Sequence, residues 1–522
     1  MIKAFRFITP VLVLLLITSF LTSCSRQSDG FVTALEANPE TLDPLRGTDA
    51  SSERLRQLMF NSLVRKNERL DYTGELASNI QQAPDGLSVT FTLHEGMTFH
   101  DGRPLTSADV KYTLDTLLAS DSRKAVPFFE GTGANKQPFV AAVETPDART
   151  VTIRLHKPWL ELLANLVPQP VIPQGTADSQ QDKPVGSGPF KFVRYDESQQ
   201  VVDLEANDKY WEGAPNIKTL RVRAILDGNT LQAELRSGRV TLVPYSTNLS
   251  PDAYKSLGQD PALKVEQFPG ANIVYLGFNT QSEPLKDARV RQAISYAVER
   301  EAIVRDLLLG QARVAHSILP EESWAYAPGK KYSYDPEQAK RLLDEANLRD
   351  PDGDGSRMRF DKPLVLKISA SNIMARGYGG VIQNSLKAIG VPLEIETLER
   401  NALLDQIRSG QYQMTIGNWV GGNQDPIFLR DLFTNLTGGN FNRSRYRTPE
   451  VERILQEAVN TTDRAKAKTL YTEAQEIISR DVPMFPLWYP ANMVVARRNV
   501  ANIKVDVSGD WSFLRNVTVE NQ

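Results

Sequence analysis

A short loop in the C-terminal half of the chain, NWVGGNQDP, contains groups suited to binding a small molecule and lacks the periodicity of a helix or strand. Trp419 offers a flat apolar surface, and Gly421 and Gly422 allow a ligand to approach the backbone closely. Asn423 and Asp425 add hydrogen-bonding groups. The combination is typical of one wall of a ligand-binding cleft, although the same tryptophan could equally belong to a core.

Three further residues are weaker candidates for the same cleft. Asn279 ends the stretch GFN, and Arg443 and Tyr446 belong to the polar stretch NRSRY. Arg443 could pair with a carboxylate of the ligand, or it could form an ordinary surface salt bridge. We predict that all three contribute to substrate binding.

Groups that would support catalysis or a resident cofactor are sparse. The chain contains no GxSxG, HExxH or GxxxxGK[ST] motif. His94 and His100 flank a predicted turn without partners at metal-ligand spacing, which favours hydrogen-bonded loop histidines. We therefore predict no catalytic residues, no metal and no cofactor, while an enzyme whose carboxylates meet in a cleft stays open as an alternative.

One acidic stretch resembles a calcium-binding loop. Asp350, Asp352 and Asp354 match its first, third and fifth positions, and Asp361 occupies the twelfth, where a bidentate glutamate is usual. The residues that follow, 364–366, predict a strand where an EF-hand would continue as a helix. A polar turn explains the stretch better, and calcium binding is left open.

The N-terminus carries the signature of an exported lipoprotein. Lys3 and Arg6 precede an apolar run shorter than the roughly 20 residues that span a membrane. The tetrapeptide LTSC, which ends at the only cysteine, Cys24, resembles the lipobox of bacterial lipoproteins. We predict a signal peptide at residues 1–23, lipid on Cys24 and a tether at residues 24–30.

Composition describes the remaining chain as a soluble protein of two or three domains. The sequence has 522 residues, of which 41% are hydrophobic and 24% charged. Removing the signal peptide leaves 58 basic against 63 acidic residues, so no nucleic-acid partner is predicted. No later run is apolar enough to span a membrane, which makes the lipid on Cys24 the predicted membrane attachment.

Local patterns predict alternating strands and helices. Hydrophobic and polar residues alternate over residues 89–93 and 151–155, as expected for half-buried strands. Capping residues predict helices that begin after Thr106, Asp287 and Asp335. Short strands and helices therefore alternate along the chain.

Several longer blocks resemble one known family. They are DGRPLTSADV at residues 101–110, GSGPF at 186–190, NDKYW at 207–211 and PLKDARVRQAI at 284–294. In this order they resemble the extracellular solute-binding proteins of family 5, the dipeptide, oligopeptide and nickel type that feed ABC importers. Gly186 and Gly188 suit a close backbone approach, so we interpret the blocks as scaffold that identifies the architecture without naming the cargo.

The resemblance implies an α/β, bilobal, periplasmic-binding-protein-like fold with a hinge and an extra third domain. Lobes joined in this way can close over a ligand. The implied division is a first lobe begun by residues 31–60, an inserted extra domain at 61–184, a first-lobe return at 185–268, a second lobe at 269–485 and a final first-lobe return at 486–522.

The function implied is that of a substrate-binding lipoprotein of an ABC importer, not an enzyme. It would be a monomer in the cell envelope, lipid-anchored on the extracytoplasmic face of a membrane, handing a peptide or small solute to permease and ATPase subunits. The alternatives are a binding protein for a nickel chelate or a non-peptide conjugate, a cleft hydrolase, and a chaperone-like lipoprotein.

The sequence departs from the peptide-binding members of this family at one position. In those members, the residue three after the loop tryptophan is an aspartate that pairs with the free α-amine of the peptide. Here that residue is Gly422, which has no side chain, and a buried ammonium without a carboxylate is costly. We favour Asp425 slightly as the replacement; otherwise the ligand lacks a cationic end.

Overall fold

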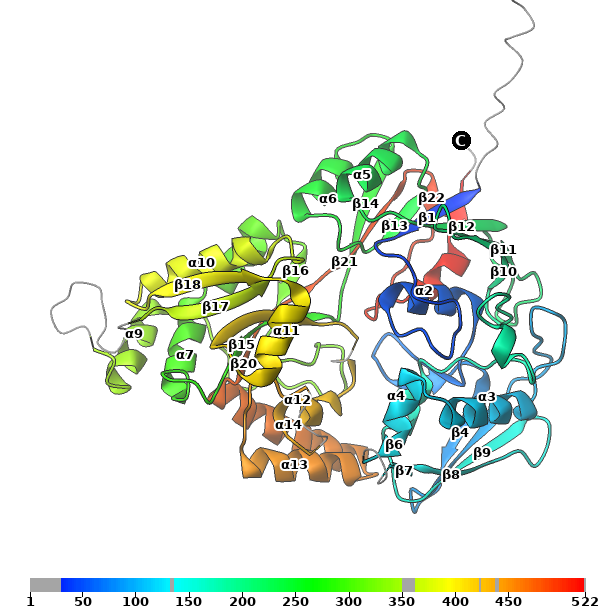
Figure 1. Cartoon of the computed structure of the whole chain (residues 1–522), viewed down its shortest axis with the longest axis horizontal. Helices are drawn as coiled ribbons and strands as arrows, with labels where there is room; N and C mark the ends of the chain where they lie inside the picture. The colour runs from blue at the N-terminus through cyan, green and yellow to red at the C-terminus, as the bar shows by residue number, and fades with distance from the viewer. Residues whose placement is uncertain (1–29, 132–135, 350–361, 422–423, 437–440, 521–522) are drawn as a thin grey trace, which may run out of the picture.

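A computed structural model describes residues 30–131, 136–349, 362–421, 424–436 and 441–520. Cys24, Gly422, Asn423 and the calcium-like Asp350, Asp352, Asp354 and Asp361 lie outside the described residues. The described chain forms two large mixed sheets, each covered by helices, and a smaller antiparallel sheet (Figure 1).

The first lobe is built on a seven-stranded sheet in which β1 runs parallel to both of its neighbours, β12 and β13. Every residue of β1 is buried, because alternate side chains enter hydrophobic clusters on opposite faces of the sheet. In spatial order the strands are β10 (Phe190–Asp196), β11 (Val201–Ala206), β12 (Thr219–Ala224), β1 (Phe31–Leu35), β13 (Leu242–Pro244), β21 (Asn492–Arg497) and β14 (Leu263–Phe268). Its helices are α2 (Ala50–Met59), α5 (Gly228–Ser237) and α6 (Pro251–Gly258), and the short β22 (Val500–Ala501) pairs with β23 (Thr518–Val519).

The second lobe is built on a six-stranded sheet, also with hydrophobic clusters on both faces. In spatial order its strands are β16 (Ala312–Val314), β20 (Met484–Pro490), β15 (Ile273–Phe278), β19 (Met414–Trp419), β17 (Leu364–Ser369) and β18 (Leu393–Leu398). Its helices are α7 (Ala288–Ala297), α8 (Arg300–Ala302), α9 (Pro336–Glu345), α10 (Ala375–Lys387), α11 (Arg400–Ser409), α12 (Phe428–Phe433), α13 (Pro449–Asn460) and α14 (Arg464–Asp481).

We call residues 61–184 the inserted domain; it lies below the first lobe in Figure 1. Its four-stranded antiparallel sheet has its own hydrophobic cluster. The strands, in spatial order, are β4 (Ala77–Gln82), β5 (Ser88–Leu93), β9 (Thr150–Leu155) and β8 (Val140–Glu144). Two hairpins, β2 (Val64–Lys66) with β3 (Tyr72–Gly74) and β6 (Phe129–Glu130) with β7 (Gln137–Pro138), and helices α3 (Ser107–Ala119) and α4 (Leu162–Leu166) complete it.

The predicted local elements are confirmed. β5 and β9 are the two alternating strands, and α3 begins after a capping box in which the Asp109 carboxylate accepts from the Thr106 N–H at 2.9 Å. Asp287 and Asp335 cap α7 and α9 by accepting backbone N–H groups of the first turn. Each of these signals is local, because a helix leaves its first N–H groups without partners inside the helix.

The chain crosses between the two large sheets at residues 269–272 and at Ala491. The predicted change of lobe at residues 485/486 falls inside β20, whose Leu487 and Trp488 are buried in the second-lobe core. Pro486 suggested a boundary, but it occurs where the β15–β20 register shifts, a position that tolerates a missing N–H. The other domain limits stay a prediction.

Candidate ligand-binding cleft

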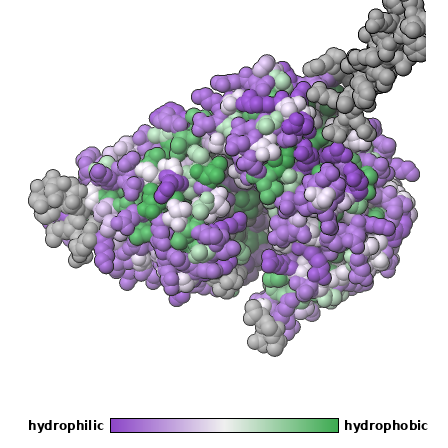
Figure 2. All heavy atoms as spheres, turned by 45° about the horizontal axis from the view of Figure 1, so that its top comes forward, coloured by the Kyte–Doolittle hydropathy of each residue, from purple (hydrophilic) through white to green (hydrophobic). Residues whose placement is uncertain are grey.

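A cleft with a volume of about 1030 Å³ lies between the lobes. Figure 2 shows the molecule hollowed between two largely hydrophilic surfaces. Its walls come from residues 48–75 and 492–515 on one side and from Val420, Gly421 and Gln424 on the other, with Tyr245 and Asn272 between them. The volume stands at the upper end of the range of about 300–1000 Å³ for small-molecule sites, so an extended ligand fits.

Most charged groups of the first-lobe wall are paired with one another. The Arg65 guanidinium donates to both carboxylate oxygens of Glu212, at 2.8 and 3.0 Å, and Arg515 pairs with the same carboxylate. Burial would raise the pKa of Glu212, but the Arg65 hydrogen bond and both arginine charges outweigh it and lower that pKa. This group holds the C-terminal segment against the inserted domain.

A second carboxylate, Glu53, holds two buried cations at the same wall. Arg56 Nε donates to Glu53 Oε2 at 2.6 Å, and Lys124 Nζ forms an ion pair with Glu53. Burial opposes the charge of Glu53, yet Arg56 and Lys124 together lower its pKa. The charged groups of this cleft wall are therefore largely paired with groups of opposite charge.

Three exposed charged side chains of the cleft remain available to a solute. Glu68, Arg69 and Asp506 line it and are exposed, and within the described part of the chain no side-chain hydrogen bond or ion pair holds them. Burial raises the pKa of Asp506, and the carboxylates of Glu68 and Asp510 raise it further. Local sequence patterns do not indicate these residues, because Asp506 is far along the chain from Glu68 and Arg69 and shares no pattern with them.

Trp419 lies behind the cleft rather than in its wall. Its ring stacks on Tyr275 with centroids 6.2 Å apart and meets Phe428 edge-on at 5.1 Å, while the Arg443 guanidinium lies 4.2 Å from its centroid. The next two residues, Val420 and Gly421, line the cleft. Trp419 therefore supports the loop from within the second lobe.

The remainder of this loop is tied to the first lobe. Gly421 has φ +74°, in the left-handed region that favours glycine, and its N–H donates to Asn272 Oδ1 at 3.1 Å. Gln424 is buried and donates from Nε2 to the Ser508 carbonyl at 3.4 Å. The loop thus meets the C-terminal segment of the opposite wall.

Asp425, the favoured anchor for a ligand amine, is already engaged. One carboxylate oxygen accepts the Tyr72 O–H from the inserted domain, and the other accepts the Ile427 N–H at 2.8 Å. Burial raises the pKa of Asp425 against the opposing charge of Lys66. Both oxygens have partners, which argues against the anchor role.

The three weaker candidates lie inside the second lobe, and none lines the cleft. The Asn279 amide is buried and donates to the carbonyls of Gly410 and Tyr412 at 3.1 and 2.8 Å. The Tyr446 hydroxyl donates to the Asp481 carboxylate at 2.6 Å. Asn279 and Tyr446 therefore stabilise loops of the lobe, and Arg443 stacks on Trp419.

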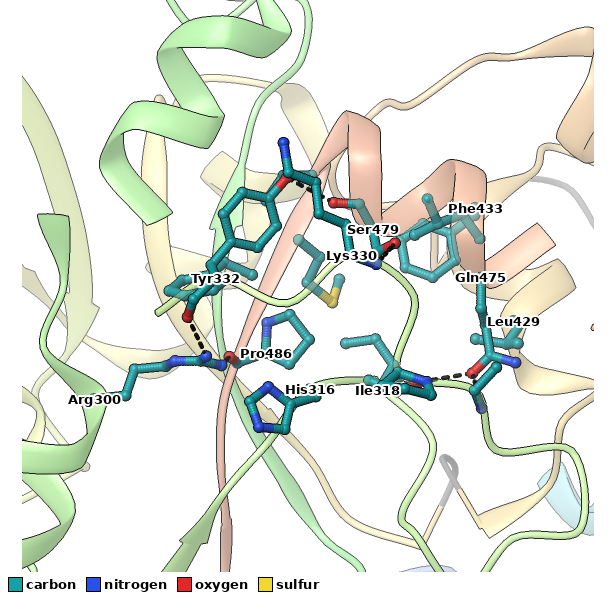
Figure 3. A pocket seen from close by; sticks show the side chains of 17 residues that line it. Arg300, His316, Ile318, Lys330, Tyr332, Leu429, Phe433, Gln475, Ser479 and Pro486 are labelled. Carbon is teal, nitrogen blue, oxygen red and sulfur yellow. Dashed lines mark hydrogen bonds between the residues drawn. The ribbon is translucent and has the colours of Figure 1, made fainter. Parts of the chain in front are cut away.

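A second hollow, within the second lobe, is too small for a solute (Figure 3). Its volume is about 30 Å³, and its lining includes Arg300, His316 and Tyr332. A water molecule needs about 10–15 Å³ measured in this way, so the hollow has room for two or three. We assign it no role in ligand binding.

The histidines at the predicted turn make structural contacts. His100 Nε2 lies 3.0 Å from the Gly188 carbonyl, and its Nδ1 accepts the Gly186 N–H at 3.3 Å. Burial lowers the pKa of His100 to about 4. His94 stacks on Trp211 at 4.6 Å. Among the residues with a described placement, no three His, Cys, Asp or Glu side chains gather to hold a metal ion.

Comparison with known proteins identifies the family. Residues 71–441, more than half of the chain, match the model of the family described as bacterial extracellular solute-binding proteins, family 5 Middle. The chain belongs to this family. Family 5 proteins bind solutes for ABC importers with permease and ATPase subunits, and the family consists of binding proteins rather than enzymes.

Relatives match nearly the whole length. The dipeptide-binding protein of Escherichia coli is 29% identical, covering 95% of this chain and 96% of its own. Heme-binding protein A of Haemophilus influenzae is 30% identical, covering 83% and 81%. The structure of the oligopeptide-binding protein AppA from Bacillus subtilis, in complex with a nonapeptide, matches with a TM-score of 0.72 and 26% identity over 94% of this chain and 99% of AppA. The predicted family and the two-lobed α/β fold are confirmed.

Within the described residues of this family 5 protein, no helix combines the length and the apolar character that crossing a bilayer requires.

Proposed function

We propose that this protein captures a peptide, or a related small solute, between its lobes and delivers it to the permease of an ABC importer. The observation that carries the proposal is the cleft itself, about 1030 Å³ with walls from both lobes. The E. coli relative and the AppA complex, which by name bind a dipeptide and a nonapeptide, support peptides as the ligand class.

Native mass spectrometry of protein purified from its host tests this directly. We expect a series of co-purifying peptides that leave on mild activation. A single non-peptide mass would contradict the peptide assignment, and turnover of a bound mass would point to an enzyme.

A solute without a free ammonium is a second candidate, favoured by the loop chemistry. Gly422 has no side chain where peptide-binding members of the family carry the amine-binding aspartate, and Tyr72 and Ile427 occupy the carboxylate of Asp425. Blocked peptides, non-peptide conjugates and metal chelates belong to this class, and heme-binding protein A is a relative named for a non-peptide ligand.

Calorimetry with the tightest-binding member of a tripeptide mixture, free and N-acetylated, separates the two candidates. We expect affinities within tenfold of each other, a gap of less than about 1.4 kcal/mol. A larger gap that Asp425→Asn abolishes would restore Asp425 as the amine anchor.

We also propose that Cys24 carries lipid and that residues 24–30 tether a monomer to the extracytoplasmic face of a membrane. The LTSC tetrapeptide after an apolar run supports the anchor. We expect Cys24→Ala to move the protein from the membrane fraction to the soluble fraction with solute binding retained. Equal membrane recovery of both forms, with an unmodified N-terminus by mass spectrometry, would refute the anchor.

A further inference from the structure

Beyond solute capture, we propose that the inserted domain is a latch: it grips the helices that follow β19 in the second lobe and holds the lobes together before a solute arrives. The latch residues are Asp71, Tyr72 and Glu161 on the inserted domain and Asp425, Arg430 and Arg464 on the second lobe. The inference depends on the proposed function only in that closure accompanies binding.

The strongest latch contact is an ion pair sheltered from water. Glu161, directly before α4, accepts from Arg430 Nη2 in α12 at 2.5 Å, with side-chain exposures of 20% and 13%. An exposed ion pair contributes little to stability, whereas a charge-assisted hydrogen bond shielded from water contributes more. Opening the lobes would separate this one. The pair therefore favours the closed arrangement.

Two neighbouring contacts join hairpin β2–β3 to the second lobe. The Tyr72 hydroxyl donates to Asp425, and Asp71 forms an ion pair with Arg464 at the start of α14. The Arg464 guanidinium also lies 4.8 Å from the centroid of Trp324, which fixes it on its own lobe. The hairpin thus contacts the segment before α12 and the first turn of α14.

The turn between β4 and β5 also approaches the second lobe. A Cβ built on Gly86 in this turn would lie 3.5 Å from Cγ2 of Thr462, which joins α13 to α14. Three separate parts of the inserted domain therefore contact one helical region of the second lobe.

These contacts lie far from the segments at which the chain crosses between the lobes. The chain crosses between the large sheets beside β21, near the centre of Figure 1, whereas α4 and α12 lie below it. Contacts far from the crossover separate most when the lobes open, so they bear on the balance between open and closed forms. A latch that raises the closed population also raises the apparent affinity for any solute that binds the closed form.

Spin-label distances measure the latch without any ligand. Cys24 is the only cysteine, so the full chain with Cys24→Ser accepts two labels at Ala142→Cys in the inserted domain and Glu473→Cys on α14, both exposed positions. Double electron–electron resonance spectroscopy of the solute-free protein should give a single, narrow distribution of short distances between the two labels. Glu161→Gln with Asp71→Asn should add a longer population.

Two controls keep the result specific. The double variant Glu161→Arg with Arg430→Glu keeps an ion pair with its charges exchanged. It should therefore give the same short distance as the parent, which a misfolded variant would not do. Lys111→Gln with Asp115→Asn removes an exposed ion pair at 2.8 Å on α3, inside the same domain, and should leave the distances unchanged. Identical distributions for the parent and the Glu161→Gln, Asp71→Asn variant would overturn the latch.

Binding of the tripeptide mixture gives a second readout. Weakening by about tenfold in the Glu161→Gln, Asp71→Asn variant is the expected result, a difference of about 1.4 kcal/mol. Unchanged affinity together with unchanged distances would reject the latch. Failure of the parent to bind any tripeptide would reject the peptide proposal alone, because the distance measurement needs no ligand.

Discussion

Two buried cations, one in each half of the molecule, are held in different ways. Lys124, 5% exposed beneath the cleft wall, forms an ion pair with Glu53 and donates to the carbonyls of Pro44 and Pro168 at 2.9 and 3.1 Å. Arg300, 1% exposed beside the small hollow of Figure 3, donates only to backbone carbonyls of the described residues: those of Ala315, of Pro486 at 2.8 Å and of Tyr332 at 2.7 Å.

The difference follows from the two cationic groups. An ammonium is a compact, strongly hydrated charge, whereas a guanidinium is delocalised, weakly hydrated and presents five donors in a fixed fork. Arg300 spreads its charge over three carbonyls and the ring of Phe485, 4.6 Å away. Lys124 depends on a carboxylate that also lines the cleft. The contact of the inserted domain with the first lobe is thus coupled to the binding wall, whereas the contacts of Arg300 lie away from it.

The largest expected effect comes from removing the carboxylate. Glu53→Gln leaves Lys124 and Arg56 buried without their shared anion, so the free energy of unfolding should fall by about 3–5 kcal/mol. Urea unfolding followed by circular dichroism measures it. As the matched control, Glu301→Gln removes an exposed carboxylate near Arg300 and should change stability by less than about 0.5 kcal/mol. Equal effects of the two variants would break the comparison.

A smaller loss is expected when the guanidinium becomes an ammonium. Arg300→Lys cannot reach three carbonyls that point at a planar fork, so at least one buried acceptor loses its donor, at a cost of about 1–3 kcal/mol. The same unfolding measurement applies, with Arg305→Lys on the exposed face as control. A variant as stable as the parent would show that the fork geometry is unimportant here.

The scaffold was largely predictable because its signals are local. Thr106, Asp287 and Asp335 cap helices through hydrogen bonds that span two or three residues. Gly186 and Gly188 were predicted to allow close backbone approach, and a Cβ at Gly188 would lie 2.5 Å from the carbonyl carbon of Met59. Spacing and residue type alone carry such information.

The cleft was predictable only in part, because its contacts join distant segments. Tyr72 and Asp425 are 353 positions apart, and nothing in the loop sequence indicates that the carboxylate already has a partner. Asn279 and Tyr446 stand in polar loops, yet their side chains turn inward to Gly410, Tyr412 and Asp481. The direction of a loop side chain depends on the tertiary fold, which local pattern does not encode.

The smallest expected effect, and the sharpest separation of the two cations, is in the alkaline pH dependence of stability. Burial lowers the pKa of Lys124 to about 8, below its ordinary 10.5, and burial lowers that of Arg300 to about 10 from 12.5. Between pH 8 and about 9, the unfolded chain therefore keeps the lysine proton that the folded chain has released, while Arg300 stays charged in both. A proton bound only by the unfolded state makes folding more favourable as pH rises.

Subtraction isolates this contribution from all other titrating groups. The difference in unfolding free energy between the parent and Lys124→Met should grow in favour of the parent by about 1 kcal/mol between pH 8 and about 9, within the limit of about 1.4 kcal/mol per pH unit set by one proton. The matched subtraction with Arg300→Met should be flat over the same interval, because the guanidinium stays protonated there. A flat difference for Lys124 as well would mean that Glu53 holds the ammonium charged in spite of burial, and the two cations would then differ in geometry but not in the cost of their charge.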